Sequence, residues 1–94
     1  MSASMIVIWD QNKAKANFKK HKISFEEAQT VLESEVQLIL EDKDHDEVRF
    51  IALGFSKHLN LLVVVYCYRF SDVIRIISAR KATKKERLMY EERI

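Results

Sequence analysis

The sequence predicts an α+β fold in which a mostly antiparallel, twisted sheet carries a helical hairpin on one face. Four apolar segments rich in β-branched residues follow one another at short spacings in the second half of the chain, which is typical of an antiparallel meander. Two S/T-x-x-E motifs, beginning at Ser24 and Thr83, mark helix N-termini. The expected order of elements is β-α-α-β-β-β-β-α.

The size and composition of the chain indicate one small domain with one hydrophobic core. The chain has 94 residues, of which 48% are hydrophobic, and this composition excludes a disordered chain. We expect the domain to span residues 5–94 after a flexible lead-in at residues 1–4, with Met1 or Met5 as the natural start. The single cysteine, Cys67, is expected to be buried and excludes an internal disulfide. No signal peptide or long apolar span is visible, which predicts a cytoplasmic protein.

The first third of the chain predicts a short edge strand followed by two helices. The strand is expected at Ile6–Trp9, and Asp10 can cap a helix from Gln11 to about His21. Ala14 and Phe18 lie four residues apart, so both are expected to face the core.

The second helix begins at a motif that predicts a capping box. In such a box the side chains of Ser24 and Glu27 each bind a backbone N–H of the other residue. The helix is expected to run to about Glu33, with one apolar face made by Phe25, Ala28, Val31 and Leu32. The short link between the two helices predicts a hairpin that packs on the sheet.

The rest of the chain predicts four strands and a final helix. The strands are expected at Val36–Leu40, Val48–Phe55, Leu61–Tyr68 and Val73–Arg80. The third of these has an unbroken apolar run, which predicts a central strand that is buried on both faces. Gly54 marks a bulge or a close approach of another segment. The final helix, Lys84 to about Arg93, is expected near the other face or an edge of the sheet.

The basic residues are concentrated at the end of the chain. Residues 69–94 carry eight basic and four acidic side chains, whereas residues 1–68 carry eight basic and ten acidic ones. A basic stripe of this kind suits a polyanion such as RNA. The alternative is a helix face that is simply solvated.

An acidic loop in the middle of the chain is the one group of residues that suggests a metal. It contains Asp42, Asp44, His45, Asp46 and Glu47. Their spacing matches no defined coordination pattern, so we predict a solvated loop, with no metal and no cofactor.

The segment from Asp72 to Tyr90 combines a strand, a basic junction and a helix start. The unpaired N–H groups of that helix N-terminus make the junction a candidate phosphate site. Strand alternation predicts Arg75 on one face and Arg80 on the other, unless a bulge intervenes. Because Arg80 lies at the end of the strand, where the chain turns, its side chain can still reach the face that carries Arg75. Arg75 can instead pair with a helix carboxylate, Glu27 or Glu33 being the candidates.

An ordered set of residues resembles the BrnT family of type II toxin–antitoxin toxins, within the RelE-like fold group. The set comprises Trp9, Asp10, Lys13, Asn17, Lys20, His21, residues 24–28, Arg49, Phe50, Gly54, Ile74–Arg80, Ala82, Thr83, Glu86, Arg87, Tyr90 and Glu91. The resemblance implies a ribonuclease that is neutralised by a BrnA-type antitoxin. It also implies that operator DNA is bound only through the antitoxin complex.

Metal-independent RNA cleavage assigns expected roles to five residues. The 2′-OH is the nucleophile, so the site needs a base, an acid and cations for the phosphorane charge. Arg80 and Arg75 are the candidate cations. His21 is the candidate for proton transfer, because histidine suits this role in general, although it can also cap its helix. The last helix offers two further candidates. Glu86 is first a capping residue and only second a base. Tyr90 can stack on a base or donate a proton, and the alternative is that it packs on the sheet.

Six further cations are expected to bind RNA. They are Lys13, Arg49, Lys81, Lys84, Lys85 and Arg87. Lys13 lies in the first turn of its helix, where a cation is unfavourable, and this conflict suggests a phosphate contact. For Arg49, a functional and a structural role are equally supported.

The charge pattern alone also fits a non-catalytic basic module that binds RNA or a protein partner. An adjacent antitoxin gene would favour the ribonuclease. Such an antitoxin is expected to cover the basic and apolar face with a segment that carries acidic and apolar residues.

Overall fold

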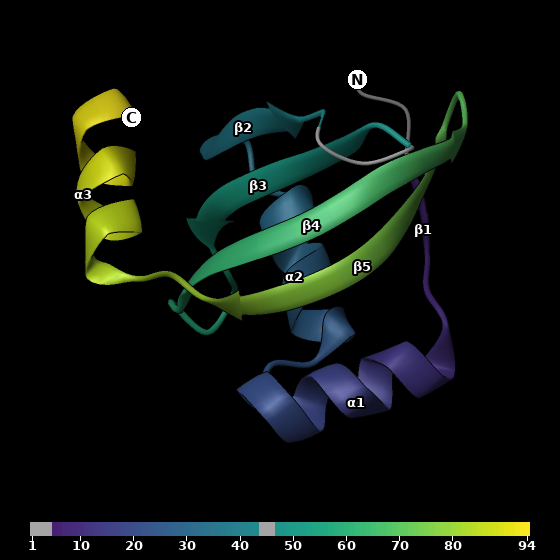
Figure 1. Cartoon of the computed structure of the whole chain (residues 1–94). Helices are drawn as coiled ribbons and strands as arrows, with labels where there is room; N and C mark the ends of the chain where they lie inside the picture. Colours follow the sequence, from purple (N-terminus) through teal and green to yellow (C-terminus); the bar gives the residue numbers. More distant parts are fainter. Residues whose placement is uncertain (1–4, 44–46) are drawn as a thin grey trace.

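A five-stranded sheet with the strand order β1-β5-β4-β3-β2 forms the centre of the structure (Figure 1). The computed structural model describes residues 5–43 and 47–94. The elements are β1 (Ile6–Ile8), α1 (Gln11–His21), α2 (Phe25–Leu32), β2 (Gln37–Asp42), β3 (Arg49–Phe55), β4 (Leu61–Phe70), β5 (Val73–Lys81) and α3 (Lys84–Arg93). Strand β1 runs parallel to β5, and the other neighbours are antiparallel. The predicted α+β order and the central position of β4 are therefore confirmed.

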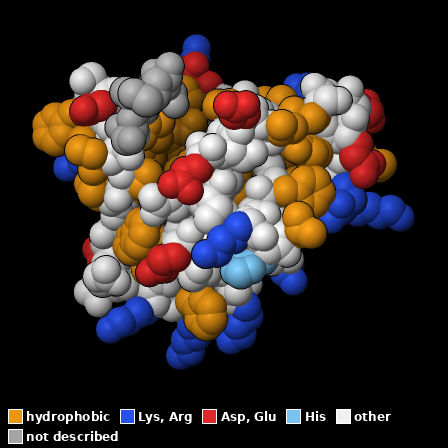
Figure 2. Space-filling view, turned by 180° about the vertical axis from the view of Figure 1, so that it is seen from behind, with side chains coloured by type: hydrophobic (Ala, Val, Ile, Leu, Met, Phe, Trp, Pro, Cys, Tyr) orange, Lys and Arg blue, Asp and Glu red, His pale blue; other side chains and the backbone are white. Residues whose placement is uncertain are grey.

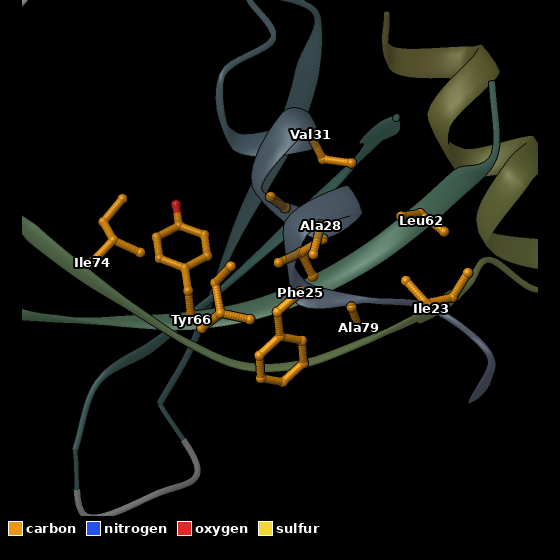
Figure 3. Close-up of a cluster of buried hydrophobic side chains, with 11 residues drawn as sticks. Ile23, Phe25, Ala28, Val31, Leu62, Tyr66, Ile74 and Ala79 are labelled. Carbon is orange, nitrogen blue, oxygen red and sulfur yellow. The ribbon is translucent and has the colours of Figure 1, made fainter. Parts of the chain in front are cut away.

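The main core lies between α2 and the sheet (Figure 3). Phe25, Ala28 and Val31 are completely buried, which confirms the predicted apolar face of α2. They pack on side chains that β4 and β5 direct to the same side, among them Leu62 and Ile76. We call this side of the sheet the hairpin face.

The predicted core position of Phe18 is wrong, because this side chain is 52% exposed. The buried residue of α1 is Asn17. Its side-chain amide donates to the Ala79 carbonyl oxygen at 2.8 Å, and its Oδ1 accepts from the Ala79 N–H at 3.1 Å. Among the described residues, strand β1 pairs with residues 73–75 of β5 and no others. Asn17 therefore takes the place of a neighbouring strand at Ala79, and α1 lies along the edge of β5 rather than flat on the sheet.

The opposite face of the sheet is covered at one end by α3. Tyr90 is 7% exposed and packs with Leu53, Leu61 and Val63 in a second core cluster. This position agrees with the prediction that the last helix lies near the other face or an edge. The rest of this face has no helix over it within the described part of the chain (Figure 1).

Gly54 permits a close approach between α2, β2 and β3. A Cβ atom at this position would lie 3.3 Å from Val31 Cγ1, from the Gln37 Cβ atom and from the Val36 carbonyl oxygen. The ladder is regular here, since Gly54 pairs with Gln37 and Leu62 without a register shift. Of the two predicted alternatives, the close approach is correct.

The helix caps agree with the sequence except at Glu27. Asp10 caps α1, and Ser24 accepts from the Glu27 N–H at 3.0 Å. The Glu27 carboxylate does not close the predicted box. It accepts instead from the Ser56 hydroxyl at 2.6 Å and from the Asn60 side chain at 2.8 Å. Although burial raises the pKa of Glu27, these hydrogen bonds lower it below its usual value. Glu27 thus ties the turn between β3 and β4 to α2.

Candidate active site

A β-bulge in β5 decides which side chains share a face of the sheet. Val65 of β4 pairs with Ser78, and the next residue, Tyr66, pairs with Ile76. The register shift leaves Ile77 as an extra residue on β5. Such an extra residue reverses the alternation of side chains beyond it.

The bulge brings Arg75, Ser78 and Arg80 to the same face, because directly opposed residues of paired strands point to one side. Their partners on β4 are Cys67, Val65 and Val63, in that order. Without a bulge, Arg75 and Arg80 were expected on opposite faces, and this expectation is corrected. The suggested pairing of Arg75 with a helix carboxylate is also wrong, since α2 lies on the other side. No ion pair of Arg75 is formed with any described residue.

Arg49 of β3 extends this group across the sheet. Ile51 pairs with Val65, and Arg49 lies two residues before Ile51, so it points to the same side. Its side chain is 29% exposed, and its Nε lies 3.7 Å from the Glu47 carboxylate. We call the surface formed by Arg49, Arg75, Ser78 and Arg80 the arginine face. It is the face turned away from α2 (Figure 1).

Arg80 is held in place at the junction of β5 and α3. Its Nη1 and Nη2 atoms each donate to one oxygen of Glu86 at 2.8 Å. The same carboxylate accepts from the Thr83 N–H at 2.8 Å, and the Thr83 hydroxyl accepts from the Glu86 N–H at 3.2 Å. The predicted capping box is therefore confirmed. Because Arg80 remains 40% exposed, its guanidinium is fixed but still accessible to an anion.

The ion pair has opposite effects on the two pKa values. Hydrogen bonds from Arg80 lower the pKa of Glu86 to about 2, and the same bonds raise the pKa of Arg80. A carboxylate with such a low pKa is a weak base. The geometry therefore favours the capping role of Glu86, with a second role in positioning Arg80.

This ion pair predicts a loss of stability in acid. Glu86 has a pKa of about 2 in the folded state and 4.5 as its ordinary value, so the unfolded chain binds more protons between these values. The contribution of this ion pair to the free energy of unfolding is complete above about pH 4.5 and disappears as the pH falls towards 2. We expect Glu86→Gln to lower the free energy of unfolding by about 1–2 kcal/mol at pH 7, after allowance for solvent screening.

Urea unfolding of the parent and of Glu86→Gln at several pH values measures this effect. The difference in unfolding free energy should shrink between pH 4.5 and pH 2. A difference that stays constant over this range would show that the ion pair does not stabilise the fold.

Tyr90 is placed for packing. Its ring contacts Phe55 edge-on with the centroids 5.6 Å apart, and its hydroxyl donates to the Val36 carbonyl oxygen at 3.2 Å. These contacts favour packing on the sheet over base stacking or proton donation.

The remaining basic residues near the junction are exposed. Lys84 and Lys85 lie in the first turn of α3. Arg87 lies one turn further along, with its guanidinium carbon 5.8 Å from the Phe55 ring centroid. Lys81 ends β5 and pairs with Leu62, so it points to the hairpin face rather than the arginine face.

The two predicted site residues of α1 are separated by the length of the helix. His21 is partly buried in the last turn, and the C-cap position is taken by Lys22 in the left-handed conformation. Figure 1 shows α1 and β5 running in the same direction, so the His21 end lies on the side of the β5–α3 junction. Lys13 is exposed near the other end of α1. The structure thus brings His21, but not Lys13, towards the junction.

Three structural roles in this region were not predicted from the sequence. Asn17 is buried and joins α1 to β5, Glu27 anchors a turn, and Ser78 lies between the two arginines of β5. Apart from the family resemblance, no signal in the sequence distinguishes Asn17 from a surface asparagine. Ser78 could be found only by predicting the bulge.

The described residues contain no group of three or more His, Cys, Asp or Glu side chains that could hold a metal ion. Of the acidic loop, Asp44, His45 and Asp46 lie outside the described residues. In the part of the chain that the structure describes, no helix is long and apolar enough to cross a membrane.

The fold and the arginine face define a small α+β domain with a group of arginines on one face of its sheet. The particular family follows from comparison with known proteins. Residues 9–86 match the family described as the ribonuclease toxin BrnT of type II toxin–antitoxin systems. The chain belongs to this family of ribonuclease toxins. The grouping with RelE-like folds stays a prediction.

A solved structure supports the same conclusion. The chain is similar to the crystal structure of the Brucella abortus ribonuclease toxin BrnT, with a TM-score of 0.70 and 25% sequence identity. The similarity covers 86% of this chain and 100% of the Brucella chain. Comparison with the curated proteins gives no significant match.

Proposed function

We propose that this toxin cleaves RNA without a metal ion and that the arginine face, together with the β5–α3 junction, binds the scissile phosphate. One observation carries the proposal: the bulge directs Arg75 and Arg80 to one face while Glu86 fixes the guanidinium of Arg80. A planar guanidinium pairs two phosphate oxygens at once. Lys84 and Lys85 extend the positive surface past the junction, where an RNA strand would continue.

The proposed reaction is an attack of the 2′-oxygen on the neighbouring phosphorus. The 2′-OH loses its proton to a base, the bond from phosphorus to the 5′-oxygen breaks, and that oxygen takes up a proton. The products are a 2′,3′-cyclic phosphate and a 5′-hydroxyl end. Arg80 and Arg75 stabilise the additional negative charge on the phosphorane. His21 is the proposed base, because it ends α1 on the side of the β5–α3 junction and histidine is the side chain that most often transfers protons in enzymes.

This mechanism predicts cleavage that persists in EDTA and requires the 2′-OH. Purified protein should cut a mixed-sequence single-stranded RNA at the same rate with EDTA and with added Mg²⁺. The same RNA with 2′-O-methyl groups at every position should remain intact, since it has no nucleophile. Gel electrophoresis of an end-labelled RNA measures both results.

A control separates this chemistry from contamination. The parent and an Arg80→Ala variant, purified side by side, should differ in rate if the activity belongs to the protein. Cleavage that needs Mg²⁺ would contradict the mechanism. Binding of RNA without any cleavage, with the fold intact, would favour a non-catalytic RNA-binding module.

The family implies an antitoxin partner, and we propose that it is of the BrnA type. The arginine face and the exposed lysines of α3 suit a segment with acidic and apolar residues. Covering this surface would block the phosphate site, and operator DNA would be bound through the antitoxin in the complex. We also propose that the toxin acts in the cytoplasm, where its RNA target is found.

A further inference from the structure

A hollow between α1 and the start of α2 lies apart from the arginine face. Its volume is about 510 Å³, and its lining includes Phe18, Phe25, Lys15, Lys19, Lys22 and Glu26. Asn17 points from α1 towards β5, whereas the hollow lies on another flank of the same helix. The proposed cleavage site does not account for this hollow.

Phe18 is the unusual residue in the hollow. It lies in the middle of α1, is 52% exposed and contributes to neither buried cluster. About half of this side chain is therefore accessible instead of packed in a core. An accessible ring at the edge of a hollow offers a flat surface on which a planar group can stack.

The charged groups around this ring are mostly positive. Lys15, Lys19 and Lys22 line the hollow and are exposed, against the single carboxylate of Glu26. Helix α1 itself contains no acidic residue. Figure 2 shows Lys and Arg side chains on both sides of hydrophobic surface along the edge of the molecule where α1 lies. Three cations around an aromatic ring are complementary to single-stranded nucleic acid, which has one planar base for each phosphate.

We infer that this hollow is a nucleotide subsite for single-stranded RNA, in which a base stacks on Phe18 and the neighbouring phosphates contact Lys15, Lys19 and Lys22. The inference rests on the proposed function, because it supplies a second contact for the same substrate. The subsite and β5 lie on different sides of α1. Only an RNA chain of several nucleotides therefore reaches both the subsite and the proposed cleavage site. It therefore favours longer substrates and leaves the chemical step at the β5–α3 junction unchanged.

The effect of Phe18→Ala on RNA binding tests the subsite. The probe is a fluorescently labelled 2′-O-methyl RNA twelve nucleotides long, which the mechanism cannot cleave, and anisotropy gives its Kd. Phe18→Ala should weaken binding by about 5- to 150-fold, as expected for the loss of one base stack. Phe18→Trp should bind like the parent. Phe70→Ala, at an aromatic residue that is 73% exposed, should have no effect.

The lysines give an independent readout through the salt dependence of binding. Lys15→Ala together with Lys19→Ala should reduce the slope of log affinity against log salt by about 1.4, or about 0.7 for each lost phosphate contact. Lys43→Ala with Lys57→Ala removes the same charge from exposed positions outside the hollow and should leave the slope unchanged. In cleavage assays, Phe18→Ala should raise KM for the long RNA while kcat stays the same.

The outcomes separate the inference from the proposed function. If the parent cleaves RNA and Phe18→Ala binds the probe like the parent, the subsite is refuted and the ribonuclease mechanism stands. If Phe18→Ala instead loses affinity for the antitoxin but not for RNA, the hollow is a protein-binding site and the inference is overturned. A parent protein that neither binds nor cleaves RNA contradicts both proposals. Circular dichroism verifies that each variant is folded.

Discussion

Arg80→Ala is expected to reduce the rate of RNA cleavage by about 10²- to 10³-fold. Loss of one preorganised donor to a developing negative charge has an effect of this size. Arg80 is held by two hydrogen bonds from its guanidinium to Glu86 and is still partly exposed, so it needs little reorganisation to meet a phosphate. Single-turnover cleavage with enzyme in excess measures the change directly.

Two further variants show whether position or charge is important. Arg80→Lys keeps the charge but cannot form the paired hydrogen bonds, so it should recover only part of the activity. Arg93→Ala removes an exposed arginine from the last turn of α3 and should leave the rate unchanged. Equal activity of the parent and Arg80→Ala would place the chemistry elsewhere.

Asn17→Ala is expected to lower the free energy of unfolding by about 2–4 kcal/mol, because it leaves buried backbone groups without partners. The side chain of Asn17 binds the N–H and the carbonyl oxygen of Ala79 and also donates to the Ile23 carbonyl oxygen at 3.0 Å. These bonds hold α1 against β5, and they keep the C-terminal end of α1 on the side of the β5–α3 junction. Urea unfolding monitored by circular dichroism gives the difference.

A neighbouring asparagine in the same helix provides the control. Asn12 is exposed, and Asn12→Ala should change the free energy of unfolding by less than about 0.5 kcal/mol. If Asn17→Ala is as stable as Asn12→Ala, the edge of β5 does not depend on the side-chain amide.

The parts of the fold that depend on local sequence could be predicted. Strand β4 has an unbroken apolar run, so it lies in the centre of the sheet. Thr83 and Glu86 have the spacing of a capping box, and the box forms. The apolar spacing of α2 predicts the side chains that are buried under the sheet. In each case neighbouring residues along the chain contain the information.

The parts that depend on tertiary contacts could not be predicted. The bulge at Ile77 arises from the pairing of β5 with β4, and it moves Arg75 and Arg80 onto one face. Phe18 has the helical spacing of a core residue, but α1 lies at the edge of the sheet, so Asn17 is buried instead. Glu27 has the spacing of a capping residue, but the turn between β3 and β4 offers it stronger partners. The sequence alone does not show which partner each of these side chains meets.

The most direct measurement of the proposed site is an NMR titration of the ¹⁵N-labelled protein with the 2′-O-methyl RNA in EDTA. We expect the backbone amides of Arg75, Ser78 and Arg80 to shift, together with those of the first turn of α3. Arg80→Ala should weaken the response at these positions. A titration that leaves β5 and the start of α3 unchanged, while other residues shift, would show that RNA binds elsewhere and would contradict the proposed active site.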